Sequence, residues 1–212
     1  PSYLHTITSY VDAILAFLKS HDFNVITVAQ LGAYMTSETG KTLPERPLVI
    51  SIDDGSASIT KLFEPRAAAA GVPYAIGLVT EWLGEEEGQV INLGDNLTDQ
   101  ILNWRDVKTL FSTGRVSILS HSHAQHHYAK SGWGGTEQGA AITSRLWIDG
   151  EQRLETEGER VRRVFDDLTA SRQSIHQHLG TTPSFLVWPY GLRDAGAEQA
   201  ARDVGFSYFL EF

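Results

Sequence analysis

The hydrophobic and polar positions along the chain follow two patterns, one with the period of a helix and one typical of buried strands. Residues 8–20 place Val11, Ile14, Leu15 and Leu18 on one helical face, after polar residues that can cap the helix. The same reasoning predicts helices at 29–35, 58–70, 104–112, 155–179 and 195–204. Short apolar runs, several rich in β-branched residues, predict strands at 24–28, 47–52, 73–79, 116–119, 184–188 and 206–210.

The order of these elements indicates the fold class. Strands and helices alternate without an internal sequence repeat, which is typical of a parallel α/β architecture, either a barrel or a doubly wound sheet. No boundary is visible, so we expect a single domain over residues 1–212. Two stretches stand apart: residues 81–97, predicted to be an acidic surface excursion, and residues 128–148, predicted to be a long loop without regular structure.

Composition and charge narrow the function classes. The chain is 42% hydrophobic and 20% charged, as globular proteins are, and no apolar run approaches the length of about 20 residues that spans a membrane. The absence of cysteine excludes disulfides, thiolate catalysis and zinc–thiolate sites. A net charge of −9 disfavours a nucleic-acid partner and favours a neutral or cationic substrate.

Two adjacent carboxylates, Asp53 and Asp54, follow the predicted strand 47–52 and precede Gly55. Gly55 allows the backbone to turn, so that both carboxylates can point the same way. One of them would then bind a cation while the other remains a general base, and the cation would keep both ionised. Because Asp-Gly pairs are also common in solvated turns, the pair alone leaves that alternative open.

Four of the eight histidines lie within residues 121–127, directly after the predicted strand 116–119. Two imidazoles and a carboxylate make a metal site that leaves positions open for water. His121 and His126 are five residues apart, so they would bind from a strand end and the turn after it rather than from one helical face. His121 and His123 form an alternative pair on one face of an extended segment, and adventitious metal binding is a further alternative.

A third group, residues 187–191 (VWPYG), ends the predicted strand 184–188. Aromatic residues beside an active site commonly stack on sugar rings, although a strand end capped by a turn is the simpler interpretation. All three groups directly follow predicted strands. Since the carboxyl ends of parallel strands form one face of an α/β fold, we expect the three groups to converge in space.

These three groups, in this order, resemble the polysaccharide deacetylases of carbohydrate esterase family 4. The matching stretches are residues 51–55 (SIDDG), His121-Ser122 with a later histidine, and residues 188–191 (WPYG). The resemblance spans about residues 8–210 and is greatest to the poly-β-1,6-N-acetylglucosamine deacetylases of biofilm systems. Those enzymes have a WPYG-type third motif and a five-residue histidine spacing, whereas most of the family has a four-residue spacing and an Arg-Pro-Pro-Tyr-type motif.

The resemblance implies a distorted (β/α) barrel of parallel strands and metal-dependent hydrolysis of N-acetyl groups on an N-acetylglucosamine polysaccharide. The implied ligands of a divalent ion, with zinc foremost and cobalt, nickel or iron also compatible, are Asp54, His121 and His126. The implied catalytic residues are Asp53 as general base and Tyr190, whose backbone N–H would contribute to an oxyanion hole. The implied substrate-binding residues are Trp188 and Pro189.

Two features depart from the family pattern. Val187 occupies the position that usually carries an arginine orienting the catalytic aspartate, so another residue must orient Asp53, and Arg193 is a candidate. No histidine after the third motif matches the general acid of the family, which lies in an N-terminal segment in the biofilm-type enzymes. His5 and His123 are candidates for that role here.

The chain begins at Pro1 with no signal-peptide pattern, and we expect that an upstream segment has been removed. The resemblance implies a secreted, periplasmic or cell-envelope location, because such enzymes act on polymers there. An N-acetylated glycan is the implied partner.

Three competing functions remain open on the sequence alone. The chain could hydrolyse another amide or imide, it could be a catalytically silent glycan-binding module, or it could be a structural or sensory metal-binding domain. A silent module would be expected to lose the base or a ligand, and a structural site should have a closed ligand set. The chain instead retains Asp53, Asp54, His121 and His126.

Overall fold

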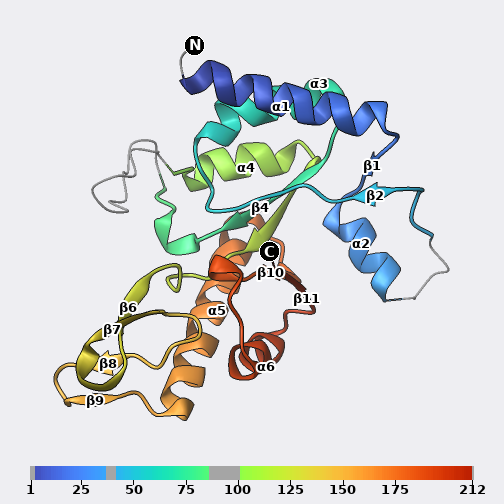
Figure 1. Ribbon diagram of the computed structural model, residues 1–212. Helices are drawn as coiled ribbons and strands as arrows, with labels where there is room; N and C mark the ends of the chain where they lie inside the picture. Colours follow the sequence, from blue (N-terminus) through green and yellow to red (C-terminus); the bar gives the residue numbers. More distant parts are fainter. Residues whose placement is uncertain (1–2, 37–41, 86–100, 212) are drawn as a thin grey trace. The chain divides into compact units, whose positions relative to one another are not determined.

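The computed structural model describes residues 3–36, 42–85 and 101–211 (Figure 1). For residues 3–7 it describes the backbone but not the side chains. These residues belong to two compact units. Unit 1 comprises Pro1–Ile76 and Leu83–Ile118, and unit 2 comprises Gly77–Trp82 and Leu119–Phe212. No helix within the described ranges is long and apolar enough to cross a membrane.

Unit 1 contains the first elements of the chain. They are α1 (Tyr3–Ser20), β1 (Asn24–Val25), α2 (Val28–Met35), β2 (Pro47–Leu48), β3 (Ser51–Ile52), the π-helical turn η1 (Ile59–Phe63), α3 (Glu64–Ala70), the start of β4 (Tyr74–Leu78), α4 (Trp104–Ser112) and the start of β5 (Val116–Ser120). The predicted helix 58–70 is therefore a π turn that continues into α3. Of the predicted excursion 81–97, residues 86–97 lie outside the described ranges.

Two of the predicted strands are shorter than the sequence pattern indicated. The strand predicted at 24–28 ends at Val25, because Thr27 caps α2 in a capping box with Gln30 and Val28 already belongs to the helix. The strand predicted at 47–52 is two separate strands. β2 pairs with β1, whereas β3 pairs in parallel with β4, with Ser51 opposite Ala75.

Unit 2 contains the rest of the chain. Its elements are η2 (Thr80–Trp82), β6 (Tyr128–Ser131), η3 (Trp133–Gly135), β7 (Glu137–Ala140), β8 (Trp147–Ile148), β9 (Arg153–Leu154), α5 (Glu157–Leu179), β10 (Phe185–Val187), η4 (Pro189–Gly191), α6 (Ala195–Val204) and β11 (Tyr208–Leu210), with the ends of β4 and β5.

The principal sheet has five strands in the order β11-β10-β5-β4-β3. β10 pairs in parallel with both β11 and β5, and Leu186 lies opposite Ser120. This register places the carboxyl ends of β5 and β10 side by side, so that His121 and Trp188 leave the sheet at the same edge. The prediction of a parallel α/β fold is confirmed.

The core of unit 2 is an apolar cluster formed by residues of β10, α5 and α6. α5 begins at a capping box formed by Thr156 and Glu159 and ends at Gly180, which has the left-handed conformation with a φ of 68°. α5 and α6 pack side by side (Figure 1). Val164 and Leu168 of α5 are completely buried in the same apolar cluster as Trp188. Such packing, rather than intrinsic helix propensity, is the usual source of helix stability.

The prediction of a long loop over 128–148 is wrong. β6 pairs antiparallel with β7, and β8 pairs antiparallel with β9. These strands are only two to four residues long and show no sustained alternation of hydrophobic and polar residues, so the sequence carries little strand signal. Gly139 is required there, because a Cβ at that position would collide with the hydroxyl oxygen of Ser144.

Candidate active site

His121 follows β5 directly, and its imidazole is held by the backbone of β10. Its Nδ1 lies 2.9 Å from the carbonyl oxygen of Val187, and the side chain is 2% exposed. A carbonyl oxygen only accepts hydrogen bonds, so in the neutral imidazole Nδ1 carries the proton and Nε2 carries the lone pair. Histidines that bind metals usually donate their other N–H in this way, so His121 has the tautomer that a ligand needs.

The imidazole of His126 lies beside that of His121. The ring centroids of the two histidines are 4.8 Å apart. Trp82 of η2 contacts His126 edge-on at 5.2 Å, and the ring of Tyr190 lies 4.3 Å from it. The structure therefore brings together both predicted histidine ligands and the predicted tyrosine of the third motif.

His123 points elsewhere. Its Nδ1 is hydrogen-bonded to the hydroxyl of Thr80 at 2.9 Å, and its backbone carbonyl accepts from the N–H of Glu81 at 3.0 Å. This geometry favours His121 with His126 over the alternative pair of His121 with His123. The other proposed acid, His5, has its side chain outside the described part of the structure.

The third motif divides into a buried part and an exposed part. Trp188 is completely buried and stacks on Phe209 at 5.5 Å, and Pro189 is also buried. The ring of Trp188 thus belongs to the apolar core, and the substrate-binding role expected for Trp188 and Pro189 stays a prediction. Tyr190 is 40% exposed, and its ring lies 4.9 Å from that of Tyr128, which is 54% exposed. Sequence reasoning missed Tyr128, although it directly follows the histidine cluster.

Each of the three motifs contains one non-glycine residue with a positive φ angle. These residues are Asp54 with 69°, Ser122 with 74° and Tyr190 with 58°. For a residue with a side chain this conformation costs about 1–2 kcal/mol, and such strain is concentrated at functional sites. The strain is consistent with a functional role for all three turns.

Asp53 and Asp54 lie in unit 1, where β3 ends. Both are partly buried, and Gly55 is buried with a φ of 76°, so the pair does not form the solvated turn that the sequence left open. The hydroxyl of Ser51 donates to Oδ1 of Asp53 at 3.3 Å. The convergence of these carboxylates with the histidines stays a prediction.

Arg193, the candidate for orienting Asp53, is held within unit 2 by two glutamates, and its role toward Asp53 stays a prediction. Its guanidinium donates to Glu211 from Nε at 2.6 Å and from Nη2 at 3.3 Å, and its Nη1 donates to Glu198. Both glutamates have lowered pKa values because of the hydrogen bonds they accept from arginine, with Arg202 contributing most at Glu198.

Sequence reasoning also missed Asp167, a carboxylate on α5 that is only 8% exposed. It accepts hydrogen bonds from the backbone N–H groups of His123 and Ala124 and from the side chain of Gln125. Burial raises the pKa of Asp167, and these hydrogen bonds offset only part of that effect. The available signal was its position at the border of the apolar face of α5.

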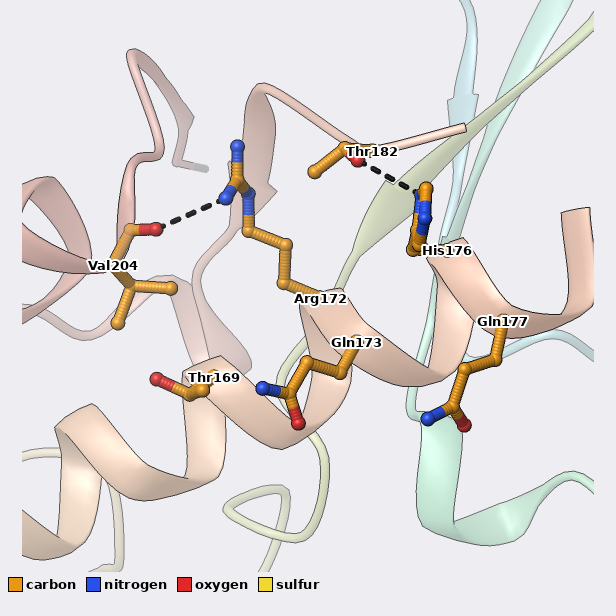
Figure 2. A pocket seen from close by; sticks show the side chains of 7 residues that line it. All are labelled: Thr169, Arg172, Gln173, His176, Gln177, Thr182 and Val204. Atoms are coloured by element: carbon orange, nitrogen blue, oxygen red, sulfur yellow. Dashed lines mark hydrogen bonds between the residues drawn. The ribbon is translucent and has the colours of Figure 1, made fainter. Parts of the chain in front are cut away.

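A cavity of about 520 Å³ lies on another face of α5 and contains none of the predicted site residues. Figure 2 shows that its polar groups partly satisfy one another: Arg172 donates to the carbonyl of Val204 at 3.2 Å, and Thr182 is hydrogen-bonded to His176 at 3.2 Å.

The chain belongs to the polysaccharide deacetylase family, whose model matches residues 40–209. It is similar to the poly-β-1,6-N-acetyl-D-glucosamine N-deacetylase of Escherichia coli strain K12, with 23% identity over 205 residues. The match covers 96% of this chain and 30% of that protein, so the chain spans less than a third of the length of this relative.

Two solved structures are similar throughout most of the chain. One is the de-N-acetylase from Aggregatibacter actinomycetemcomitans, with 26% identity, a TM-score of 0.86, and coverage of 96% of this chain and 77% of the other. The second is the BpsB deacetylase domain from Bordetella bronchiseptica, with 28% identity, a TM-score of 0.86, and coverage of 95% and 76%. The predicted family and its (β/α)-barrel type of fold are confirmed.

Proposed function

We propose that this chain is a metal-dependent deacetylase that hydrolyses the acetamido groups of an N-acetylglucosamine-containing polysaccharide. The reaction consumes water, releases acetate and leaves free amines on the polymer. Family membership and the similarity to the Escherichia coli enzyme support this function. The observation that carries it is the pair of adjacent imidazoles, one of which is held in the ligand tautomer by the carbonyl of Val187.

We assign the metal to Asp54, His121 and His126. This proposal brings one carboxylate of unit 1 together with two imidazoles of unit 2. One carboxylate with two imidazoles fits zinc and is also compatible with cobalt, nickel or iron. Asp54 follows β3 and His121 follows β5, and the two strands belong to one sheet. The carboxyl ends of parallel strands are where such folds build their sites.

The other residues perform the proton transfers and the charge stabilisation. When bound, a divalent ion supplies Lewis-acid polarisation of the acetamide carbonyl and of the attacking water. Asp53 takes the proton of that water as the general base, and the amine nitrogen gains a proton as its bond to the acetyl carbon breaks. The backbone N–H of Tyr190 donates to the oxyanion of the tetrahedral intermediate, and such stabilisation is usually the largest single catalytic effect.

The sugar is assigned to the exposed aromatic rings beside His126. Tyr190 and Tyr128 present neighbouring ring faces, and aromatic faces suit the apolar faces of sugar rings. A polymeric substrate places the enzyme where such polymers occur, which means outside the cytoplasm, in the periplasm or at the envelope.

The test is an assay of acetate release from a panel of N-acetylglucosamine polymers, run with and without a chelator. We expect acetate and free amines to appear in equal amounts, and we expect the chelator to stop the reaction. Hydrolysis of a different amide with no acetate from any glycan would favour the competing hydrolase. Binding of the glycan without turnover, in metal-loaded protein, would favour the silent binding module.

A further inference from the structure

α5 carries three polar residues at four-residue spacing, Arg163, Asp167 and Ser171, here called the polar row. Residues four apart lie on one helical face. Ser171 is completely buried, and its hydroxyl lies 2.7 Å from that of Ser120, the last residue of β5. The Ser171 end of the polar row therefore lies beside the end of β5 that precedes His121, and the row continues along α5.

The carboxylate of Asp167 on α5 binds the middle of the turn that lies between His121 and His126. Its carboxylate accepts from the N–H of His123 at 2.9 Å, from the N–H of Ala124 at 2.7 Å and from Nε2 of Gln125 at 3.3 Å. Ser122, with its positive φ, precedes these amides. Consecutive backbone N–H groups after such a residue form a concavity that binds anions, and here the anion is a side chain of the protein itself.

Arg163 holds the same turn from the neighbouring position of the row. Its Nη1 donates to Oε1 of Gln125 and, at 2.9 Å, to the carbonyl of Ala141. Its Nε and Nη2 donate to the two carboxylate oxygens of Glu155 at 2.8 and 2.9 Å. Gln125 is thus fixed at its oxygen by Arg163 and at its nitrogen by Asp167, and it is 6% exposed.

We propose that Asp167 is a positioning residue that sets the shape of the 122–125 turn and thereby the approach of His126 to His121. His121 is anchored independently by Val187, so the turn decides where the second imidazole stands. The consequence for metal binding rests on the proposed function. Mutation of a residue that orients a metal ligand typically lowers metal affinity about 10- to 100-fold.

The experiment compares Asp167→Asn with Asp166→Asn in the full chain. The two variants change adjacent positions of α5 identically, but Asp166 is exposed and pairs with Arg162 at the surface. Co²⁺ is titrated into the metal-free proteins, and its visible absorption reports both affinity and coordination geometry. We expect Asp167→Asn to lower Co²⁺ affinity by about 10- to 100-fold and to change the spectrum, and we expect Asp166→Asn to match the wild type. Wild-type affinity in a folded Asp167→Asn variant would overturn the proposal.

Amide hydrogen exchange in the metal-free proteins separates this proposal from the metal assignment. The N–H groups of His123 and Ala124 should be protected in the wild type and should exchange faster in Asp167→Asn, while the amides within β10 keep their protection. Unchanged exchange at His123 and Ala124 would overturn the positioning role whatever the metal does. If the wild type bound no Co²⁺ but the exchange changed as expected, the metal assignment would fail and the role of Asp167 in shaping the turn would stand.

Discussion

At the scale of single residues, the two adjacent aspartates after β3 have different proposed roles: Asp53 is the general base and Asp54 is a metal ligand. Asp53 accepts a hydrogen bond from Ser51, whereas Asp54 has the left-handed backbone conformation. Adjacent side chains of an extended strand point to opposite sides, and the turn at Asp54 changes that relation. Substituting one carboxylate at a time can therefore separate loss of the general base from loss of a metal ligand.

Asp53→Asn should reduce acetate release by about 10²–10⁴-fold, because the general base is lost while the metal ligands stay intact. Metal content, measured by elemental analysis of the purified protein, should remain that of the wild type. His121→Ala is the comparison: it should lose both metal and activity. An Asp53→Asn enzyme that releases acetate at the wild-type rate would show that the base has been assigned to the wrong residue.

Trp188→Ala should act on stability rather than on substrate binding. The side chain is completely buried in the core, and removing such an aromatic residue costs about 3–5 kcal/mol of unfolding free energy. Urea unfolding measures this loss, and Trp188→Phe should cost less because the ring is partly retained. A Trp188→Ala protein of normal stability with a raised KM would return this residue to the substrate site.

Tyr128→Ala should raise KM for the polymer and leave kcat nearly unchanged, because the ring contributes contact area but no reacting atom. Tyr128→Phe keeps the aromatic face and should behave like the wild type. Tyr34→Ala, which removes a tyrosine of unit 1 with 48% exposure, controls for the loss of a surface ring. Equal KM values for all three variants would exclude Tyr128 from the sugar-binding surface.

Much of the candidate site was proposed from residue types and their spacing, and the pairing of His121 with His126 is what the structure of unit 2 supports. His121, His126 and the two aspartates were recognisable because few structural roles need those residues directly after strands. The distribution of tasks within the third motif could not be predicted. Which of Trp188 and Tyr190 faces solvent depends on the φ of 58° at Tyr190, and a sequence pattern does not reveal a strained torsion in an aromatic residue.

At the scale of elements, helix α5 illustrates what periodicity shows and what it leaves out. Its span was predicted as 155–179 and is Glu157–Leu179. The end before Gly180 was predicted correctly, whereas the predicted start was two residues early because Thr156 caps the helix. The role of Asp167 could not be predicted from periodicity, since its partners are backbone N–H groups from a distant segment. The strands β6–β9 were missed because backbone pairing leaves no hydrophobic alternation.

The first turn of α5 should make stability depend on pH in the acid range. Hydrogen bonds from the side chain of Arg153, and then from Thr156, lower the pKa of Glu159 from 4.5 to about 2. A carboxyl group with a lowered folded-state pKa stabilises the fold above its unfolded pKa, and this contribution is lost as the pH falls toward the folded value.

The stability difference between the wild type and Glu159→Gln should therefore be largest near neutral pH and should shrink as the pH falls from 4.5 to about 2. Urea unfolding over this range measures it. Glu159 is exposed, so added salt should reduce the difference at neutral pH as well. A difference that stays constant with pH would mean that the ion pair with Arg153 does not form in solution.

At the scale of the whole molecule, the net charge of −9 has a consequence for the substrate. Deacetylation converts a neutral polymer into a cationic one, so the attraction to the enzyme increases as the reaction proceeds. Raising the salt concentration from about 10 mM to about 100 mM shortens the screening length from about 30 Å to about 10 Å. KM for a partly deacetylated polymer should therefore rise over this range, measured from initial rates, whereas KM for the fully acetylated polymer should change little. If KM changed equally with salt for both polymers, the net charge of the enzyme would have no role in binding the product.

The spacing of Arg163, Asp167 and Ser171 also limits how the length of the chain can vary. Each residue added to an α-helix turns everything after it by about 100°. A single extra residue between Asp167 and Ser171 would therefore remove Ser171 from Ser120 while Asp167 kept its amides, and an extra residue before Arg163 would disturb all three at once. Among relatives, insertions and deletions should therefore be found beyond Gly180 or among the hairpins, and rarely within residues 157–171 of this helix.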